Sequence, residues 1–192
     1  MASVSQSLYQ HDLEQTRENR ERLCKNHNLM FWYQKLYQNV LRSESRIAEK
    51  CVLEIGSGAS PLVNFLPTVI TSDVLELEYL DIVFDCHNIA GLTQIPDHSI
   101  DIITLTNVLH HLHDPVLFLR NATRKLTKGG RVYIVEPYFS LLSYPLFKFL
   151  HHEPVNFNVP LPQLDKIDGP LSSSNQAIPY MIFFSRRGWS VR

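Results

Sequence analysis

Two glycines and an acid follow a short apolar run in the stretch VLEIGSGASPL, residues 52–62. Gly56 and Gly58 let the backbone approach a ligand closely, because neither has a Cβ atom. A helix that begins after such a turn adds free N–H groups and the positive end of its dipole. The stretch therefore predicts a turn that binds a nucleotide-like cofactor, with a plain turn as the alternative.

Two more acids end the apolar runs that follow. Asp73 closes TVITSDV, 15 residues after Gly58, where a carboxylate suits the two hydroxyls of a ribose. Asp85 closes LDIVFD, where a carboxylate can accept a hydrogen bond from an exocyclic amine such as that of adenine. The alternatives are a helix cap at the surface for Asp73 and an ordinary loop acid for Asp85.

Histidines are numerous, nine in all, and several stand close together in NVLHHLHDP and in LHHEP. His110 or His111 could serve as a general base if the reaction removes a proton from a hydroxyl or a protonated amine. The alternative is a histidine that packs or caps. We expect no metal site around His110, His111 and His113, because Asp114 is the only acid at ligand spacing.

The elements that would position these residues alternate along the middle of the chain. Short apolar runs predict five buried strands, at residues 51–55, 68–74, 80–85, 99–108 and 131–137. Strands that alternate with crossovers indicate a parallel sheet with helices on both faces. Ligands of such sheets lie beyond the carboxyl ends of the strands, near the point where strand order reverses.

Helices are expected after the first and the fourth strand. Ser60 and Pro61 suit the N-cap and first position of one helix, and Asp114 and Pro115 suit those of the other. The KGG that follows supplies a glycine for a left-handed helix end. These helices are expected over residues 61–66 and 114–126.

The flanks of this alternating region are less regular. Apolar residues recur at helical spacing over 21–42, after a polar start that is a frayed end or a first helix. Prolines predict a long loop over 153–175, and 178–184 has the composition of a possible sixth strand. The apolar run YFSLLSYPLFKFLHHEP could line an acceptor site or touch a lipid-like acceptor, with a core helix as the alternative.

Taken in order, the glycine turn, Asp73, Asp85, SIDIITLTNVLHHLHDP and LTKGGRVYIVEP resemble the class I S-adenosylmethionine-dependent methyltransferases, over roughly residues 50–137. The resemblance extends to a bacterial-type subgroup that acts on small molecules. It implies a Rossmann-like three-layer α/β/α sandwich with a mostly parallel sheet. The cofactor would be S-adenosylmethionine, with S-adenosylhomocysteine as product. The residues that the resemblance assigns to the cofactor are Glu54, Gly56, Ser57, Gly58, Asp73, Val74, Asp85, Cys86 and Asn107.

The same resemblance implies methyl transfer by in-line displacement to a small-molecule or a lipid- or sugar-linked acceptor. A dinucleotide-binding domain is the nearest competitor, but it would need a glycine at Pro61 and has no acid to match Asp85. A P-loop is excluded because no GK[ST] follows the glycines. A further alternative, from another class, is a non-catalytic relative that binds a partner through the region after residue 138.

The chain departs from the family pattern at two places. Ser60 replaces the third glycine of the turn, which predicts weaker cofactor binding rather than none. The family's sheet has seven strands, whereas five are expected here with one more possible, so the fold is expected to be shortened at its C-terminal edge. An exposed edge strand of this kind invites pairing with another chain, so the alternatives are a homodimer through that edge or a chain of impaired activity.

Length and charge limit the remaining possibilities. The 192 residues suit one domain, expected as an N-terminal helical segment (1–50), a cofactor-binding core (51–137) and a substrate-side part (138–192). A net charge of -1 gives no reason to expect a nucleic-acid partner. Three widely spaced cysteines favour reduced thiols and a cytoplasmic protein. No apolar run is long enough to predict a membrane span.

Overall fold

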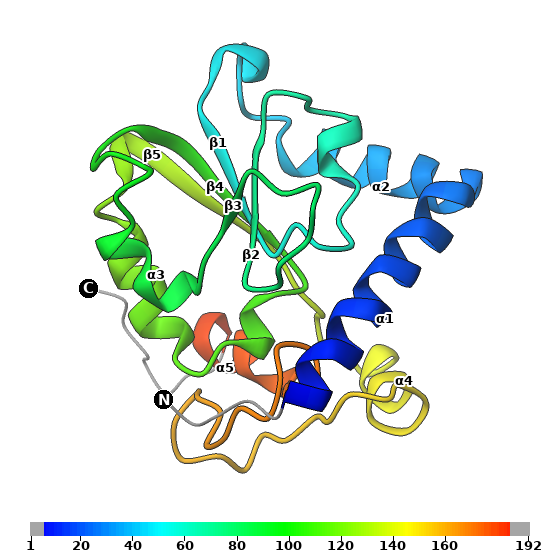
Figure 1. Ribbon diagram of the computed structural model, residues 1–192. Coiled ribbons are helices and arrows are strands. Elements are labelled where there is room, and N and C mark those ends of the chain that lie inside the picture. The colour runs from blue at the N-terminus through cyan, green and yellow to red at the C-terminus, as the bar shows by residue number, and fades with distance from the viewer. Residues whose placement is uncertain (1–5, 185–192) are drawn as a thin grey trace.

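The computed structural model describes residues 6–184. At its centre lies a five-stranded parallel sheet in the order β3-β2-β1-β4-β5 (Figure 1). The strands are β1 (Val52–Ile55), β2 (Ile70–Asp73), β3 (Ile82–Val83), β4 (Ile100–Thr106) and β5 (Leu126–Val135). Strand order reverses between β1 and β4, so ligands are expected beyond the carboxyl ends of these two strands.

Helices cover both faces of the sheet. They are α1 (Gln6–Lys25), α2 (His27–Val40), α3 (Pro115–Ala122), α4 (Ser143–Leu150) and α5 (Ala177–Phe183). Leu53 and Ile103 of the strands pack with Phe118 of α3 in the larger core, which also contains Ile178 of α5. The neighbouring strand residues Val52 and Ile102 point to the opposite face and pack in a second core with Tyr37 of α2. The expected three-layer α/β/α fold is therefore confirmed.

The predicted helices are partly wrong in their bounds. The helix expected over 21–42 is two helices, because the Asn26 side chain accepts hydrogen bonds from Asn28 N and Leu29 N and caps α2. The polar residues before position 21 belong to α1 from Gln6 onward. The helix expected over 61–66 is only a 3-10 turn at Leu62–Asn64.

The C-terminal half contains two more corrections. The helix expected to reach residue 126 ends at Ala122, and KGG lies inside β5, where Gly129 has a φ of 85°. The possible strand at 178–184 is helix α5. Its buried residues include Ile178, Met181 and Ile182, a helical spacing that the β-branched and aromatic composition concealed. Residues 185–192, where the sequence reads SRRGWSVR, lie outside the described residues.

The long loop predicted over 153–175 is confirmed, since residues 151–176 contain no helix or strand. It folds back over the segment that follows β4. Leu164 N donates to His113 O at 3.1 Å, and Asn175 N donates to His110 O at 3.0 Å. The loop thus reaches the carboxyl edge of the sheet. Among residues 6–184, no helix has the length and apolar character needed to cross a membrane.

Candidate functional site

The glycine turn after β1 has backbone geometry that only glycine accepts without strain. Gly56 has a φ of 74°, and a Cβ atom there would meet Val108 Cγ2 at 2.3 Å. A Cβ atom on Gly58 would meet Thr16 Cγ2 at 2.7 Å and Asp73 Oδ2 at 2.9 Å. The turn is therefore in close contact with α1, with the end of β2 and with the segment after β4.

Ser60 ties the turn to the end of β1. Its hydroxyl donates to Glu54 Oε1 at 2.6 Å and accepts from Leu62 N at 3.2 Å. The Tyr37 hydroxyl lies 3.0 Å from the same oxygen. The expected N-cap role is wrong in detail, since Pro61 precedes the 3-10 turn as its cap residue. Serine instead provides a hydroxyl that a glycine would lack.

Glu54 is the most unusual acid near the turn. Its side chain is buried, and its Oε2 atom has no hydrogen-bond partner. Burial raises the pKa of this carboxyl to about 7, against the hydrogen bonds from Ser60 and Ser57 and the charge of Arg20. An unpaired buried oxygen of this kind is available to a cationic donor.

Asp73 and Asp85 stand where the sequence places them, at the ends of neighbouring strands. Asp73 accepts from Gly58 N at 2.9 Å and from Leu75 N at 3.1 Å, and burial raises its pKa in spite of these bonds. Asp85 accepts from His87 N at 2.9 Å and from His87 Nδ1 at 2.7 Å, which holds its pKa below the usual range. Each of the two carboxylates keeps lone pairs for a further donor.

A cavity of about 900 Å³ lies above this edge of the sheet. Seven of the nine residues assigned to the cofactor line it, namely Gly56, Gly58, Asp73, Val74, Asp85, Cys86 and Asn107. The other two, Glu54 and Ser57, are buried at and just after the end of β1 without lining the cavity. The structure thus brings the set together around one space, and its binding role stays a prediction.

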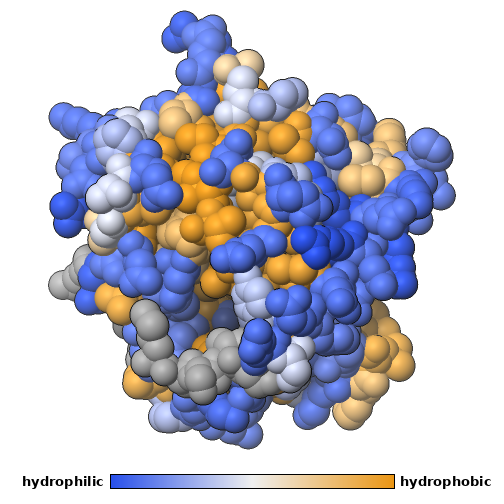
Figure 2. Space-filling view, viewed as in Figure 1, coloured by the Kyte–Doolittle hydropathy of each residue, from blue (hydrophilic) through white to orange (hydrophobic). Residues whose placement is uncertain are grey.

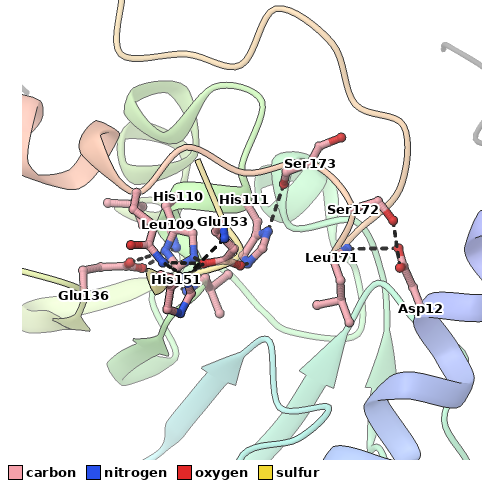
Figure 3. A network of polar contacts seen from close by, with 12 residues as sticks. Asp12, Leu109, His110, His111, Glu136, His151, Glu153, Leu171, Ser172 and Ser173 are labelled. Carbon is pink, nitrogen blue, oxygen red and sulfur yellow. Dashed lines mark hydrogen bonds and ion pairs between the residues drawn. The ribbon is translucent and has the colours of Figure 1, made fainter. Parts of the chain in front are cut away.

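Helix α1 makes contacts beside the two cavities that the sequence analysis did not find. Arg20 Nη1 donates to Ser60 O at 2.7 Å, and its guanidinium lies 4.3 Å from the centre of the Tyr79 ring. Asp12 is buried and accepts from Leu171 N at 3.0 Å and Ser172 Oγ at 2.9 Å (Figure 3). No motif marks these residues, because their partners come from distant parts of the chain.

The histidines after β4 form a polar cluster with two glutamates (Figure 3). His110 is buried; its Nδ1 lies 2.5 Å from Glu136 Oε2, and its Nε2 lies 3.4 Å from Glu153 Oε2. His111 Nε2 lies 3.2 Å from Glu153 Oε1, and its Nδ1 lies 2.9 Å from Ser173 O. The loop therefore supplies a carboxylate that both histidines share.

Glu136 holds the cluster in place from the end of β5. Its Oε1 accepts from Val108 N at 2.9 Å and Leu109 N at 2.6 Å. Burial lowers the pKa of His110, but its hydrogen bonds to Glu136 and Glu153 outweigh this and raise the pKa to about 9. Burial alone would raise the pKa of Glu153. Hydrogen bonds from His110, His111 and Gln176 outweigh this effect and hold the pKa well below the usual range.

The same cluster is a grouping that could hold a metal ion. The ligand atoms of His110, His111 and Glu153 lie within 4.8 Å of one another. The acid is Glu153, which stands far from the histidines in sequence, rather than Asp114, which caps α3 by accepting from Leu117 N. A second such grouping is formed by Asp85, Cys86 and His87.

A second cavity, of about 940 Å³, adjoins the first. It is bounded by His110, His111, Glu136 and Glu153, by Trp32 and Leu36 of α2 and by Phe147 of α4, among others. Six residues line both cavities, namely Asn19, Tyr33, Thr106, Asn107, His111 and Leu171. The junction is therefore bounded by α1, α2, the long loop and the carboxyl end of β4, where Asn107 has a φ of 56°. Such backbone strain often accompanies functional sites.

The family model described as "Methyltransferase domain" matches residues 16–163. Among solved structures, a possible histamine N-methyltransferase from Thermotoga maritima is 19% identical with a TM-score of 0.49, over 68% of this chain and 67% of that one. The YcgJ protein from Bacillus subtilis is 24% identical with a TM-score of 0.42, over 54% and 50%.

The CurJ carbon methyltransferase is 18% identical with a TM-score of 0.42, over 62% of this chain and 37% of that one. This chain thus spans half or less of the YcgJ and CurJ structures. No curated protein matches it.

Proposed function

This chain belongs to the methyltransferase-domain family, and we propose that it transfers a methyl group from S-adenosylmethionine to an acceptor bound in the second cavity. The observation that carries the proposal is the junction of two cavities at Thr106, Asn107 and His111. The first cavity is lined by the glycine turn and two strand-end acids. The second contains a histidine paired with carboxylates. This arrangement suits a donor on one side and an acceptor on the other.

The residues of the first cavity fit S-adenosylmethionine, the cofactor that the family implies. Glu54 does not line this cavity, but it lies one residue before Ile55 and two before Gly56, which do, and its buried Oε2 has no partner, which would suit a cationic amino group that reached it. Asp73 would hold the ribose hydroxyls, and Asp85 with Cys86 would border the adenine. When bound, this cofactor supplies an electrophilic methyl group on a sulfonium.

The chain's own contribution is alignment and proton transfer. Residues that fix the acceptor at the junction would hold it in line with the donor, and alignment of this kind is worth about 7–11 kcal/mol of a barrier. With a carboxylate at each ring nitrogen, His110 stays protonated up to about pH 9, so it could act as a base only after Nε2 loses its proton and its contact with Glu153. It would then take a proton from the acceptor at Nε2, while Glu136 holds Nδ1–H and orients the ring. Because Glu153 lies at Nε2 in this structure, the acceptor would have to take its place. His111, whose Nε2 also contacts Glu153, would be the alternative base.

The acceptor that we propose is a small molecule or a lipid- or sugar-linked group. Apolar side chains of Trp32, Leu36 and Phe147 form part of the cavity wall.

We also propose that β5, one of the two edge strands of the sheet among residues 6–184, pairs with a second copy of the chain. Sedimentation velocity over a range of protein concentrations tests this pairing.

Thermal unfolding with S-adenosylhomocysteine tests the proposal, because a ligand that binds only the folded chain raises the melting temperature. We expect a rise with S-adenosylhomocysteine and none with NAD, which serves as the matched nucleotide control. Folded protein that shows no rise at millimolar S-adenosylhomocysteine would overturn the proposal. Binding without methylation of any acceptor in a broad extract screen would instead indicate a non-catalytic relative.

A further inference from the structure

Helix α4 turns its apolar face outward. Leu142, Leu146, Phe149 and Leu150 recur at helical spacing, and their exposed fractions are 84%, 57%, 75% and 79%. Leu141, just before them, is 96% exposed. Hydrophobic side chains are visible at the surface where α4 lies, at the lower right of Figure 2. A surface helix normally points such a stripe at the core, so this face is built to meet something else.

The inward side of α4 is already occupied. Phe147 and Tyr144 contact Phe139, with ring centres 5.6 Å and 6.1 Å apart. Phe139 is itself buried and also lies beside the ring of Phe157. The helix is thus fixed to the protein by its aromatic side, and the exposed leucines and Phe149 are not needed for that contact.

Lys148 carries the one fixed charge of α4, and residues 137–152 contain no aspartate or glutamate. His151 and His152 follow the helix, where burial lowers the pKa of His151, and Glu153 comes next in the chain. Lys148 Nζ lies 3.0 Å from the Tyr144 hydroxyl and 5.7 Å from the centre of the Phe149 ring. A cation beside exposed aromatic and aliphatic side chains is the arrangement of helices that lie in a membrane interface.

We propose that α4 docks on the surface of an anionic lipid bilayer, with Leu141, Leu142, Leu146, Phe149 and Leu150 entering the headgroup region and Lys148 contacting anionic headgroups. A protein partner is a poorer occupant, because stable protein interfaces use about 20–30 residues a side. Here five side chains on and beside a helix of 8 residues form the patch. Interfacial helices bury such a face only about 5–10 Å deep, which this short helix can do.

Helix α4 also borders the second cavity. Phe147, His151 and His152 line that cavity from α4 and the residues just after it. A bilayer bound by α4 would place an amphiphilic molecule at the cavity, with its polar group toward His110 and Glu153. This consequence for the acceptor class rests on the proposed methyl transfer; the docking itself does not.

Sedimentation of the full chain with lipid vesicles tests the docking. The probes are vesicles of equal parts phosphatidylcholine and phosphatidylglycerol, and vesicles of phosphatidylcholine alone. We expect binding to the anionic vesicles and a loss on the order of tenfold or more in the double variant Leu142→Ser/Phe149→Ser. The matched control is Leu29→Ser/Phe31→Ser, which removes exposed side chains of the same types from α2. Lys148→Ser should weaken binding about fivefold on anionic vesicles, from about 1 kcal/mol per basic residue.

Three results would overturn the docking. The first is wild-type protein that stays in the supernatant with both kinds of vesicle. The second is a control variant, Leu29→Ser/Phe31→Ser, that loses as much binding as the α4 variant. The third is dimerisation of the protein through the exposed face of α4. The last would appear as a concentration-dependent mass that the α4 variant abolishes. The rise in melting temperature with S-adenosylhomocysteine is measured on the same samples. It distinguishes failure of the membrane docking from failure of the proposed methyl transfer, because docking can fail while the cofactor still binds.

Discussion

Gly56→Ala tests whether the turn after β1 is as closely packed as the structure indicates. Two costs add at this position. A φ of 74° costs an alanine about 1–2 kcal/mol, and its Cβ atom would stand 2.3 Å from Val108 Cγ2, an overpacking that typically costs about 1–3 kcal/mol. We therefore expect the free energy of unfolding to fall by about 2–5 kcal/mol, measured by urea titration followed by circular dichroism.

Gly129→Ala separates the two costs. Gly129 has a φ of 85°, but no heavy atom lies within 4 Å of where its Cβ atom would stand. This variant should lose only the backbone part, about 1–2 kcal/mol. The difference between the two variants, about 1–3 kcal/mol, then measures the contact with Val108. Adding Val108→Ala to Gly56→Ala should recover part of that difference, which a double-mutant cycle reports as coupling.

Equal losses in Gly56→Ala and Gly129→Ala would refute this reasoning, because they would mean that the Val108 contact costs nothing. Zero coupling between Gly56→Ala and Val108→Ala would refute it independently. Affinity for S-adenosylhomocysteine should fall with Gly56→Ala and stay unchanged with Gly129→Ala, since only the first glycine lines the cavity.

Three further outcomes are expected. Asp73→Asn should lower the affinity for S-adenosylhomocysteine, measured by calorimetry, by at least on the order of tenfold. An unchanged affinity would show that Asp73 does not bind the ribose. Folding raises the pKa of Glu54 from 4.5 to about 7, so its contribution to stability is complete below about pH 4.5 and is lost as pH rises through about 7. From about pH 5 to about pH 8, the free energy of unfolding measured by urea titration should fall on the order of 2–3 kcal/mol more for the wild type than for Glu54→Gln. An equal fall in both proteins would contradict the raised pKa. His110→Ala should lower the rate of methyl transfer by about 10²–10⁴ with cofactor affinity kept, while the exposed His27→Ala should not; equal rates would exclude His110 as the base.

The sheet could be predicted from the sequence because its strands lie in short apolar runs with polar ends, although β5 begins at Leu126, before the start expected at residue 131. Val52 to Ile55 are all buried, and so is most of β4, so local composition and tertiary environment agree. Helix bounds were harder to predict, because they depend on single side chains. Asn26 divides the expected helix 21–42 by capping α2, and nothing in the apolar spacing marks that break.

Helix α5 shows a different limit. IPYMIFF is rich in residues that favour strands, yet it forms a helix whose Ile178 and Ile182 pack in the same core as the strands. In this segment, burial of one helical face outweighs intrinsic strand preference, which is a weak bias in any case. No local pattern could decide between the two, because a short apolar run suits either a strand or a buried helix.

The cofactor side of the site and the acceptor side differ in the same way. Gly56, Gly58, Asp73 and Asp85 sit at or next to the ends of parallel strands, and the topology of the sheet brings such ends together whatever the loops do. Glu153 reaches His110 and His111 only because a loop without regular structure folds back over β4. A contact made by such a loop depends on packing along its whole length, so neither NVLHHLHDP nor LHHEP could reveal the pairing alone. The second cavity, where we propose that the acceptor binds, is lined by this loop, α1, α2 and α4 as well as by the ends of β4 and β5. Its shape therefore depends largely on parts of the chain whose positions the strand pattern leaves undetermined.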